Sequence, residues 1–418
     1  MITMDKVTSV KLNLSALSVY RGIMQRSVPA AFYQLLCSLN KTPDEFLEHW
    51  GAFYSLLCER GFADRLAYAL TEAALYDENV FTRSAAGNTC GELPQSVLDA
   101  AAHDCRTILE AASLSSDDVL NAYTRCDDIR EIAGDLPKWQ NGKCAQIFDC
   151  FDGTPDSIAS YYRENGCGMF ARYKGFIWRD GDIRPVLNYD TIDMNDLTGY
   201  ERQRQKVVDN TQAFLDGKTC NNCLLYGDMG TGKSSTVKAV ANRFHHRGLR
   251  LVEMPKEQLK DFPLLVDKIA HLPIKFIIFI DDLSFQHQDQ SYTMLKAVLE
   301  GGVAARPSNA LIYATSNRRH IVKERLSDRA IEVDDINTRD NMQETLSLSD
   351  RFGLSVCYTV PSKREFLEIV TAMAKQRSIN MPADELCAAA ERFALAKGGR
   401  SPRCAKQFVE SLFAEKHT

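Results

Sequence analysis

A glycine-rich segment at residues 223–235, CLLYGDMGTGKSS, constrains the fold more than any other part of the chain. An apolar run leads into a loop bounded by Gly227 and Gly232, and Lys233 begins a helical pattern. The pattern G-x-x-x-x-G-K-S between a strand and a helix is that of a phosphate-binding loop. A polyphosphate needs a backbone that wraps closely around it and directs N–H groups inwards, and side chains would obstruct those conformations. The segment therefore predicts a nucleotide-binding α/β core.

Individual positions in this loop have distinct expected roles. Lys233 supplies a positive charge for the β- and γ-phosphates, and the hydroxyl of Ser234 is suited to bind Mg²⁺. The N-terminus of the following helix adds partial positive charge. A glycine turn that merely joins a strand to a helix is the alternative, but the segment after it has the amphipathic period of a core helix. The residues expected to bind nucleotide are Gly227, Asp228, Met229, Gly230, Thr231, Gly232, Lys233, Ser234 and Ser235.

Two apolar runs further along the chain predict core strands that end in polar residues. Residues 276–280 are followed by Asp281 and Asp282, and residues 310–315 lead to Asn317. Because the carboxyl ends of parallel strands meet at one edge of a sheet, we expect these side chains to lie near the phosphate loop. Asp281 is the candidate for Mg²⁺, Asp282 for orienting or deprotonating the attacking water, and Asn317 for the γ-phosphate or that water. The alternatives are a solvated acidic pair and a turn-forming asparagine.

Two arginines are further candidates. Arg351 comes immediately before the last predicted strand, residues 354–360. The remainder predicts three helices, and Arg403 lies in the first turn of the third. A cation there opposes the helix dipole unless an anion is close, so Arg403 is a candidate phosphate contact and Arg400 a weaker one. The alternative is a solvated arginine.

The first 135 residues show helical periodicity and few strand patterns, so they predict a helical domain without a catalytic constellation. Residues 136–190 are aromatic, and Asp180-Gly181 between two apolar-alternating runs predicts a β-hairpin. Basic and aromatic side chains interleave there, an arrangement that suits stacking on single-stranded nucleic acid. The favoured interpretation is a hairpin with one buried aromatic face and one solvated basic face. These side chains are Arg172, Lys174, Arg179 and Arg184, with Phe170, Tyr173, Phe176 and Trp178.

Composition limits the partners and the compartment. The 418 residues carry a formal net charge of −5, which gives no general attraction to nucleic acid or acidic lipid. The start lacks a basic region followed by an apolar core, and no stretch has the apolar length of a membrane span, so we expect a cytoplasmic protein. The 13 cysteines are irregularly spaced, which favours reduced thiols. Cys220 and Cys223 form a C-x-x-C without a second pair, and core packing is the favoured interpretation.

The order of these motifs resembles that of AAA+ ATPases over about residues 192–418. The segments NNCLLYGDMGTGKSSTVKAV, FIDDLSF, LIYATSNRRH and LSLSDRFGL are also similar to a bacterial family of AAA+ ATPases known only as a domain of unknown function. The hairpin region and the segment DLTGYERQRQKVVDNTQAFLDG are similar to that family as well, so the resemblance extends back to about residue 140.

The resemblance implies an α/β fold with a five-stranded parallel sheet, a C-terminal helical lid, and ATP bound between them at a subunit boundary. It also implies that Asn317 is a sensor on the fourth strand, that Arg351 is an arginine finger reaching into the next subunit, and that Arg403 is a lid sensor. Arg329 is a rival finger because it also lies in a Ser-Asp-Arg context. Many AAA+ proteins have Glu after the metal-binding Asp, whereas this chain has Asp282.

We therefore expect four regions and an ATPase. The regions are a helical N-terminal domain, residues 1–135, a hairpin-containing region, 136–190, an AAA+ core, 191–360, and a helical lid, 361–418. The expected function is Mg²⁺-dependent ATP hydrolysis by a homo-oligomer that remodels or loads an unidentified macromolecular partner. Two alternatives stay open: a nucleotide-dependent binding switch with negligible hydrolysis, and a helicase-loader-like ATPase that binds DNA.

Overall fold

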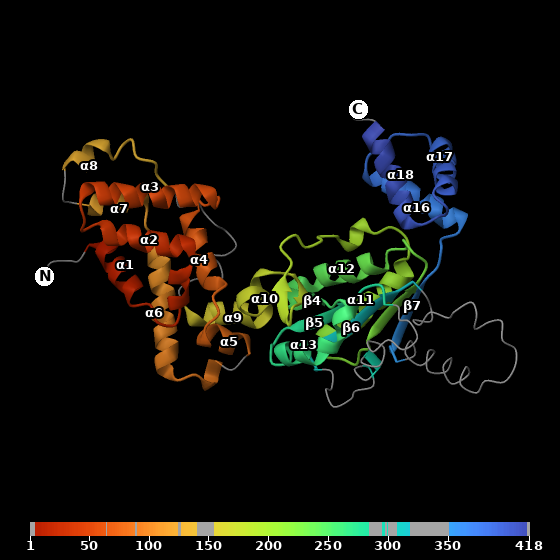
Figure 1. Cartoon of the computed structure of the whole chain (residues 1–418), viewed down its shortest axis with the longest axis horizontal. Coiled ribbons are helices and arrows are strands. Elements are labelled where there is room, and N and C mark those ends of the chain that lie inside the picture. Colours follow the sequence, from red (N-terminus) through yellow and green to blue (C-terminus); the bar gives the residue numbers. More distant parts are fainter. Residues whose placement is uncertain are drawn as a thin grey trace. The chain divides into compact units, whose positions relative to one another are not determined.

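The computed structural model describes residues 5–63, 65–87, 90–123, 127–139, 154–283, 295–296, 299, 307–317 and 351–415 (Figure 1). The chain divides into two compact units, Met1–Arg172 and Tyr173–Thr418. The first is helical, as the periodicity of its sequence predicts, and the second contains the sheet. Among the described residues, no helix combines the length and the apolar character that a bilayer span requires.

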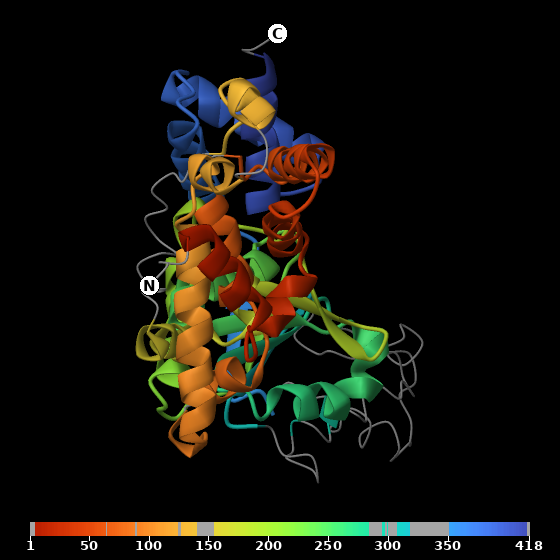
Figure 2. The same ribbon diagram turned by 90° about the vertical axis from the view of Figure 1, so that its left-hand side faces the viewer.

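The first unit is built from helices of very different length. In Figure 2 the long orange helix is α6, and α1, α4 and α9 all pack against it. The helices are α1 (Lys6–Ser15), α2 (Ser27–Ser38), α3 (Pro43–Glu59), α4 (Leu66–Leu75), α5 (Val80–Ala86), α6 (Gln95–Ala112), α7 (Ser116–Ala122), α8 (Asp127–Ile132), α9 (Pro155–Asn165) and α10 (Gly168–Arg172), with 3₁₀ turns at Arg21–Gln25 and Cys90–Glu92.

An aromatic cluster holds α2 and α3 to the segment after α8. Trp139 is buried, with its ring 4.8 Å from that of Trp50 and edge-on to Phe53 at 5.2 Å between centroids. Each indole N–H also has a partner, because Trp50 Nε1 donates to the carbonyl of Pro137 and Trp139 Nε1 to that of Leu114. Buried tryptophans that satisfy their N–H in this way add both apolar area and directional bonds. This core explains the apolar periodicity of α3 without any catalytic role.

The second unit contains a seven-stranded sheet in the order β2-β1-β4-β5-β6-β3-β7. Five strands, β3 to β7, are mutually parallel and form the predicted core. The strand that carries the phosphate loop, β3, lies between β6 and β7, so β6 separates it from β5. The strands are β1 (Gly175–Arg179), β2 (Asp182–Pro185), β3 (Cys223–Gly227), β4 (Leu249–Glu253), β5 (Lys275–Ile280), β6 (Ala310–Ser316) and β7 (Leu354–Tyr358).

The central strands are apolar because they are covered on both faces. Residues 276–280 of β5 and 310–316 of β6 are all buried. On one face, α11 (Glu201–Leu215) and α12 (Lys233–Phe244) pack Val207 and Val240 against Leu251 and Phe279 (Figure 1). Continuous apolar runs are typical of parallel strands buried in this way. Within the described part of the core, α13 (Phe262–Ile269) is a further helix, and 3₁₀ turns span Met194–Asp196, His245–Arg247 and Lys256–Asp261.

The hairpin is part of the main sheet, which differs from the expected five strands and from a separate region at 136–190. Strand β1 pairs in parallel with β4, and β2 pairs antiparallel with β1. Phe176 and Trp178 are buried, and the Trp178 indole N–H donates to Asp261. The physical reason is that β4 would otherwise leave an open sheet edge, and the aromatic face of the hairpin needs a surface to cover. The structure thus has the expected buried aromatic face.

Three helices after β7 form the predicted helical lid. They are α16 (Lys363–Gln376), α17 (Ala383–Ala396) and α18 (Pro402–Glu415). Their own core includes Phe366, Leu386 and Phe408. Ser362 begins α16 with a capping box: its hydroxyl accepts from the Glu365 N–H, and the Glu365 carboxylate accepts from the Ser362 N–H. Residues 318–350, which include Arg329, lie outside the described residues.

Replacing Trp178 with Ala should destabilise the second unit by about 3–5 kcal/mol, because a fully buried aromatic side chain and its hydrogen bond are lost. Urea unfolding followed by circular dichroism measures the change. Arg179→Ala is the matched control, since the Arg179 side chain is 70% exposed on the same strand. An equal loss of stability in both variants would contradict the role of Trp178 in attaching the hairpin.

Candidate nucleotide-binding site

The phosphate loop depends on glycine where the backbone meets β7. Gly227 has a φ of +126°, and a Cβ at this position would lie 2.1 Å from the carbonyl oxygen of Tyr358. The next residue, Asp228, donates its backbone N–H to that same oxygen at 2.8 Å. Gly230 and Gly232 also have positive φ values, +74° and +91°. The glycine pattern therefore reflects both left-handed backbone conformations and one close approach between two strands.

Lys233 is the centre of the site. Its ammonium group donates to the carbonyl oxygens of Gly227, at 2.8 Å, and Asp228, at 2.7 Å, and to Oδ1 of Asn317 at 3.0 Å. Burial lowers the pKa of Lys233, while the nearby carboxylates of Asp228, Asp282 and Asp281 act in the opposite direction. Two of the three ammonium protons are thus directed to the loop and the third to Asn317, directly after β6, close to where phosphate oxygens would bind.

The predicted metal ligands meet at the start of α12. The Ser234 hydroxyl donates to Oδ1 of Asp281 at 2.6 Å, and the Thr315 hydroxyl donates to the same oxygen. A hydroxyl and a carboxylate are the hard oxygen ligands that Mg²⁺ prefers, and they are already adjacent. Within the described part of the chain, no cluster of three or more His, Cys, Asp or Glu side chains is placed to hold a metal ion. The residues present fit a Mg²⁺ whose remaining ligands are phosphate oxygens and water.

Asp282 and Asn317 are brought together by the order of the strands. Because β6 lies between β3 and β5, Asn317 at its end stands between the loop and the acidic pair. Its amide Nδ2 donates to Oδ1 of Asp282 at 2.7 Å while its Oδ1 accepts from Lys233. Asp282 has a φ of +50°, and its N–H donates to Thr315 Oγ1 at 2.9 Å. This left-handed turn directs the second carboxylate towards Asn317.

The arginine candidates separate into different places. Arg403 lies against the loop, since its backbone N–H donates to the carbonyl of Gly230 at 3.1 Å. Arg400 instead makes two hydrogen bonds to Glu391, at 3.0 and 2.8 Å, which explains why it is the weaker candidate. Arg351 lies at the start of β7, and β7 runs parallel to β3. Arg351 therefore lies beside the N-terminal ends of the parallel strands, whereas the phosphate loop lies at their C-terminal ends. Arg329 is outside the described residues.

A cleft of about 990 Å³ extends from the loop to the lid. One wall is the segment 190–200, in which the sequence predicted no site residue, although this segment falls in the stretch that resembles the family. Tyr200 there has a φ of +59°, and its hydroxyl donates to the carbonyl of Thr359 at 2.6 Å. Gln376 of the lid donates to the carbonyl of Asn195. The lining includes Asp190, Ile192, Leu197, Tyr200, Thr231, Ser235, Met373, Arg377, Arg403, Lys406, Val409 and Glu410.

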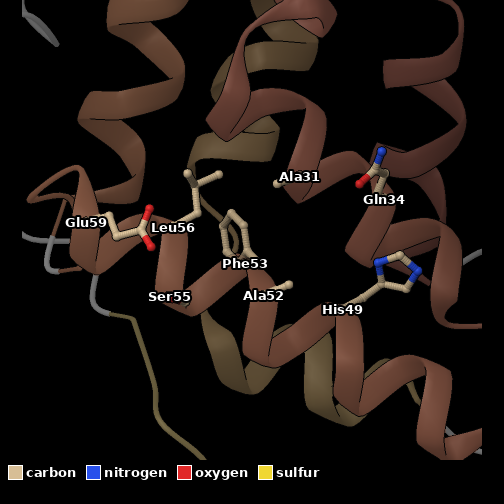
Figure 3. A pocket seen from close by; sticks show the side chains of 8 residues that line it. All are labelled: Ala31, Gln34, His49, Ala52, Phe53, Ser55, Leu56 and Glu59. Atoms are coloured by element: carbon tan, nitrogen blue, oxygen red, sulfur yellow. The ribbon is translucent and has the colours of Figure 1, made fainter.

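The first unit has a separate pocket of about 370 Å³ between α2 and α3. Figure 3 shows Phe53 near its middle, with His49 and Glu59 well apart. Its lining residues are Ala31, Gln34, His49, Ala52, Phe53, Ser55, Leu56 and Glu59. The spacing of the two ionisable groups offers no acid–base pair, so this pocket contributes no chemistry to the site.

Gly227→Ala should abolish nucleotide binding and lower the thermal stability, because its Cβ would collide with the Tyr358 carbonyl. Gly217→Ala is the matched control: Gly217 also has a positive φ, +70°, but its Cβ would meet no atom within 4 Å. The control carries only the left-handed penalty of about 1–2 kcal/mol. Titration with a fluorescent ATP analogue and differential scanning fluorimetry distinguish the variants, and equal behaviour would contradict the close approach.

The comparisons with known proteins include a family model that covers nearly all of the second unit. A family model described as "Protein of unknown function (DUF815)" matches residues 171–416. A 26S proteasome regulatory subunit 4 homolog from Encephalitozoon cuniculi (strain GB-M1) is 30% identical over 145 residues, which cover 29% of this chain and 34% of that protein. The chain thus matches about a third of that relative's length.

Two solved structures are similar over about half of the chain. The Holliday junction branch migration motor RuvB of Thermotoga maritima has 12% identity and a TM-score of 0.32, covering 53% of this chain and 72% of that one. A RuvB mutant has 14% identity and a TM-score of 0.37, covering 52% and 64%. Likeness this distant has no bearing on function. The family model spans more than half of the chain, so the chain, with its phosphate loop, acidic strand end and helical lid, belongs to the DUF815 family and has an AAA+ type of core.

Proposed function

We propose that this protein is a Mg²⁺-dependent ATPase. The observation that supports the proposal most strongly is the single hydrogen-bonded path from Lys233 through Asn317 to Asp282, beside the Ser234–Asp281 pair. A site that only held phosphate would need the loop and Lys233. A polar side chain that joins the phosphate-binding cation to a second carboxylate is what positioning a water for hydrolysis requires.

In this proposal each residue has one task. Lys233 and the loop N–H groups hold the β- and γ-phosphates, and Asn317 keeps Asp282 at the γ-phosphate side of the loop. Asp282 orients the attacking water and accepts its proton. Ser234 and Asp281 would hold Mg²⁺, which when bound neutralises charge on the phosphate oxygens. Arg403, next to Gly230, would contact the nucleotide from the lid.

We further propose that the active form is a homo-oligomer. Arg351 lies at the end of the sheet opposite its own phosphate loop. In this proposal it would therefore act on the nucleotide site of a neighbouring subunit. An arginine supplied in trans stabilises charge in the transition state more than in the bound substrate. Hydrolysis would then depend on assembly, and nucleotide binding would not.

The partner that such an ATPase remodels would be recognised by the first unit. Residues 1–172 contain 15 Lys and Arg and 23 Asp and Glu, a formal net charge of −8, against +3 for the rest of the chain. An acidic helical unit is poorly suited to nucleic acid and favours a protein partner. The hairpin aromatics Phe176 and Trp178 are buried, so they offer no face for base stacking, which weakens the DNA-loading alternative.

A nucleotide-dependent switch is the second candidate function. Its supporting observation is that Asp282, already the shorter acid at this position, has an oxygen occupied by the Asn317 amide. Steady-state ATPase activity measured against protein concentration separates the two candidates. The specific activity of an ATPase with sites shared between subunits rises as the protein assembles, whereas the ATPase activity of a switch stays near background.

Asp282→Asn should lower ATP turnover by about 10²–10⁴-fold and leave ATP affinity within a few-fold, because only the acceptor of the water proton is lost. A coupled-enzyme assay and a binding titration measure the two effects. Lys233→Ala is the contrasting variant and should lose binding itself. Wild-type turnover in Asp282→Asn would remove this residue from the mechanism.

Arg351→Ala should keep ATP binding and lower turnover by about 10³-fold or more. Mixing it with Asp282→Asn tests action in trans, because one variant keeps an intact site and the other an intact finger. In a random mixture about a quarter of the interfaces combine both, so activity should reappear. If the mixture recovers no activity, or if Arg351→Ala alone has normal turnover, Arg351 is not the arginine finger. Arg329→Ala is then the variant to measure, because Arg329 is the rival candidate.

A further inference from the structure

The side chain of Asp228, the second residue of the phosphate loop, bonds to the connection that leads to the lid. Its Oδ2 accepts from the Val360 N–H at 2.7 Å. The backbone N–H of Asp228 donates to the carbonyl oxygen of Tyr358, which is two residues before Val360, at 2.8 Å. One loop residue therefore binds the end of β7 with its main chain and the following linker with its carboxylate.

The linker held in this way is short and determines where the lid begins. Only residues 359–362 separate β7 from α16, and Ser362 already caps that helix. Figure 1 shows this blue segment running from β7 to the lid helices. Tyr200 binds the same linker from the other wall of the cleft, through its hydroxyl and the Thr359 carbonyl. A change at Val360 therefore reaches α16 within three residues.

A second bond joins the same loop to the other end of the lid. The Gly230 carbonyl accepts from the Arg403 N–H, in the first turn of α18, at 3.1 Å. A Cβ on Gly230 would lie 3.2 Å from both Arg403 Cβ and Ser401 Oγ, so the contact is tight. The loop is thus attached to the start and to the last helix of the lid, and a rearrangement of the loop must be felt at both.

We propose that Asp228 is a positioning residue that couples occupancy of the phosphate loop to the hinge of the lid. The inference rests on the proposed nucleotide-binding function. Phosphate held by the loop N–H groups fixes the loop backbone, which also carries the Asp228 carbonyl bound by Lys233 and by the Thr231 hydroxyl. When Asp228 is fixed, its hydrogen bond to the Val360 N–H breaks less often. The linker at residues 359–362, which is the hinge of the lid, is therefore less mobile with nucleotide than without it.

Hydrogen–deuterium exchange measures the persistence of this bond directly. The linker has few amide protons besides that of Val360, because Pro361 has none. In the full-length protein, saturating ATP with Mg²⁺ should slow exchange of the Val360 amide by about tenfold, less than the full effect of a hydrogen bond to a charged acceptor, because the bond is already present without nucleotide. Asp228→Ala should remove the nucleotide-dependent slowing when each variant is compared at its own saturating ATP concentration. Asp228→Asn is the matched control and should retain it, since the amide oxygen still accepts.

The outcomes separate the inference from the proposed function. Binding of ATP with equal slowing in wild type and Asp228→Ala would overturn the coupling and leave nucleotide binding intact. Absence of ATP binding by the wild-type chain would overturn the function and the coupling with it. If Asp228→Ala unfolds, Val360→Pro removes the donor and keeps the carboxylate. Exchange at the Glu365 and Phe366 amides should then become independent of nucleotide, and retained dependence would reject the coupling.

Discussion

The ammonium group of Lys233 is the interaction on which the rest of the site depends. Its three protons are shared between two loop carbonyls and Asn317, so one cation closes the loop and joins it to a different strand. Burial lowers the pKa of this group, and the surrounding carboxylates counter that effect. A phosphate oxygen that bound this cation would replace one of these three acceptors, because an ammonium group has only three protons.

Strand order turns this local arrangement into a site. With β6 between β3 and β5, Asn317 reaches both Lys233 and Asp282, and the Thr315 hydroxyl reaches Asp281. If β5 lay directly beside β3, no side chain of a third strand would stand between the cation and the acids. The parallel arrangement also places Arg351 at the N-terminal end of β7, at the end of the sheet opposite the phosphate loop. The same topology thus separates the side chains gathered at the phosphate loop from Arg351 at the other end of the sheet.

The lid connects to this site through the loop and not only through the cleft. The two main-chain attachments at Tyr358 and Arg403 and the carboxylate bond to Val360 lie within a few residues of Lys233. A phosphate loop attached in this way transmits its state to a neighbouring module by hydrogen bonds alone. No large apolar interface between the core and the lid is needed for such coupling.

Much of the core was predictable because its signals are local. The glycine spacing, the apolar runs of β5 and β6 and the three helices after β7 each depend on short segments, and the structure has them where the sequence predicts. The Asp228–Val360 bond was not predictable, because it joins residues 132 positions apart. The cleft wall at 190–200 was not predictable either, because it faces the loop and the lid only in the folded chain. The hairpin was predicted as a hairpin, but its pairing with β4 needed the tertiary structure.

The sequence by itself determined the phosphate loop, the residue types at the ends of the core strands and the helical character of both ends of the chain. These follow from backbone conformation and apolar periodicity, which are properties of short segments. Only the tertiary structure decided that Asn317 bridges Lys233 and Asp282, that Arg400 binds Glu391 and that Arg351 lies at the end of the sheet away from its own loop. Those outcomes depend on which strands are neighbours and in which direction they run, and no short segment encodes that.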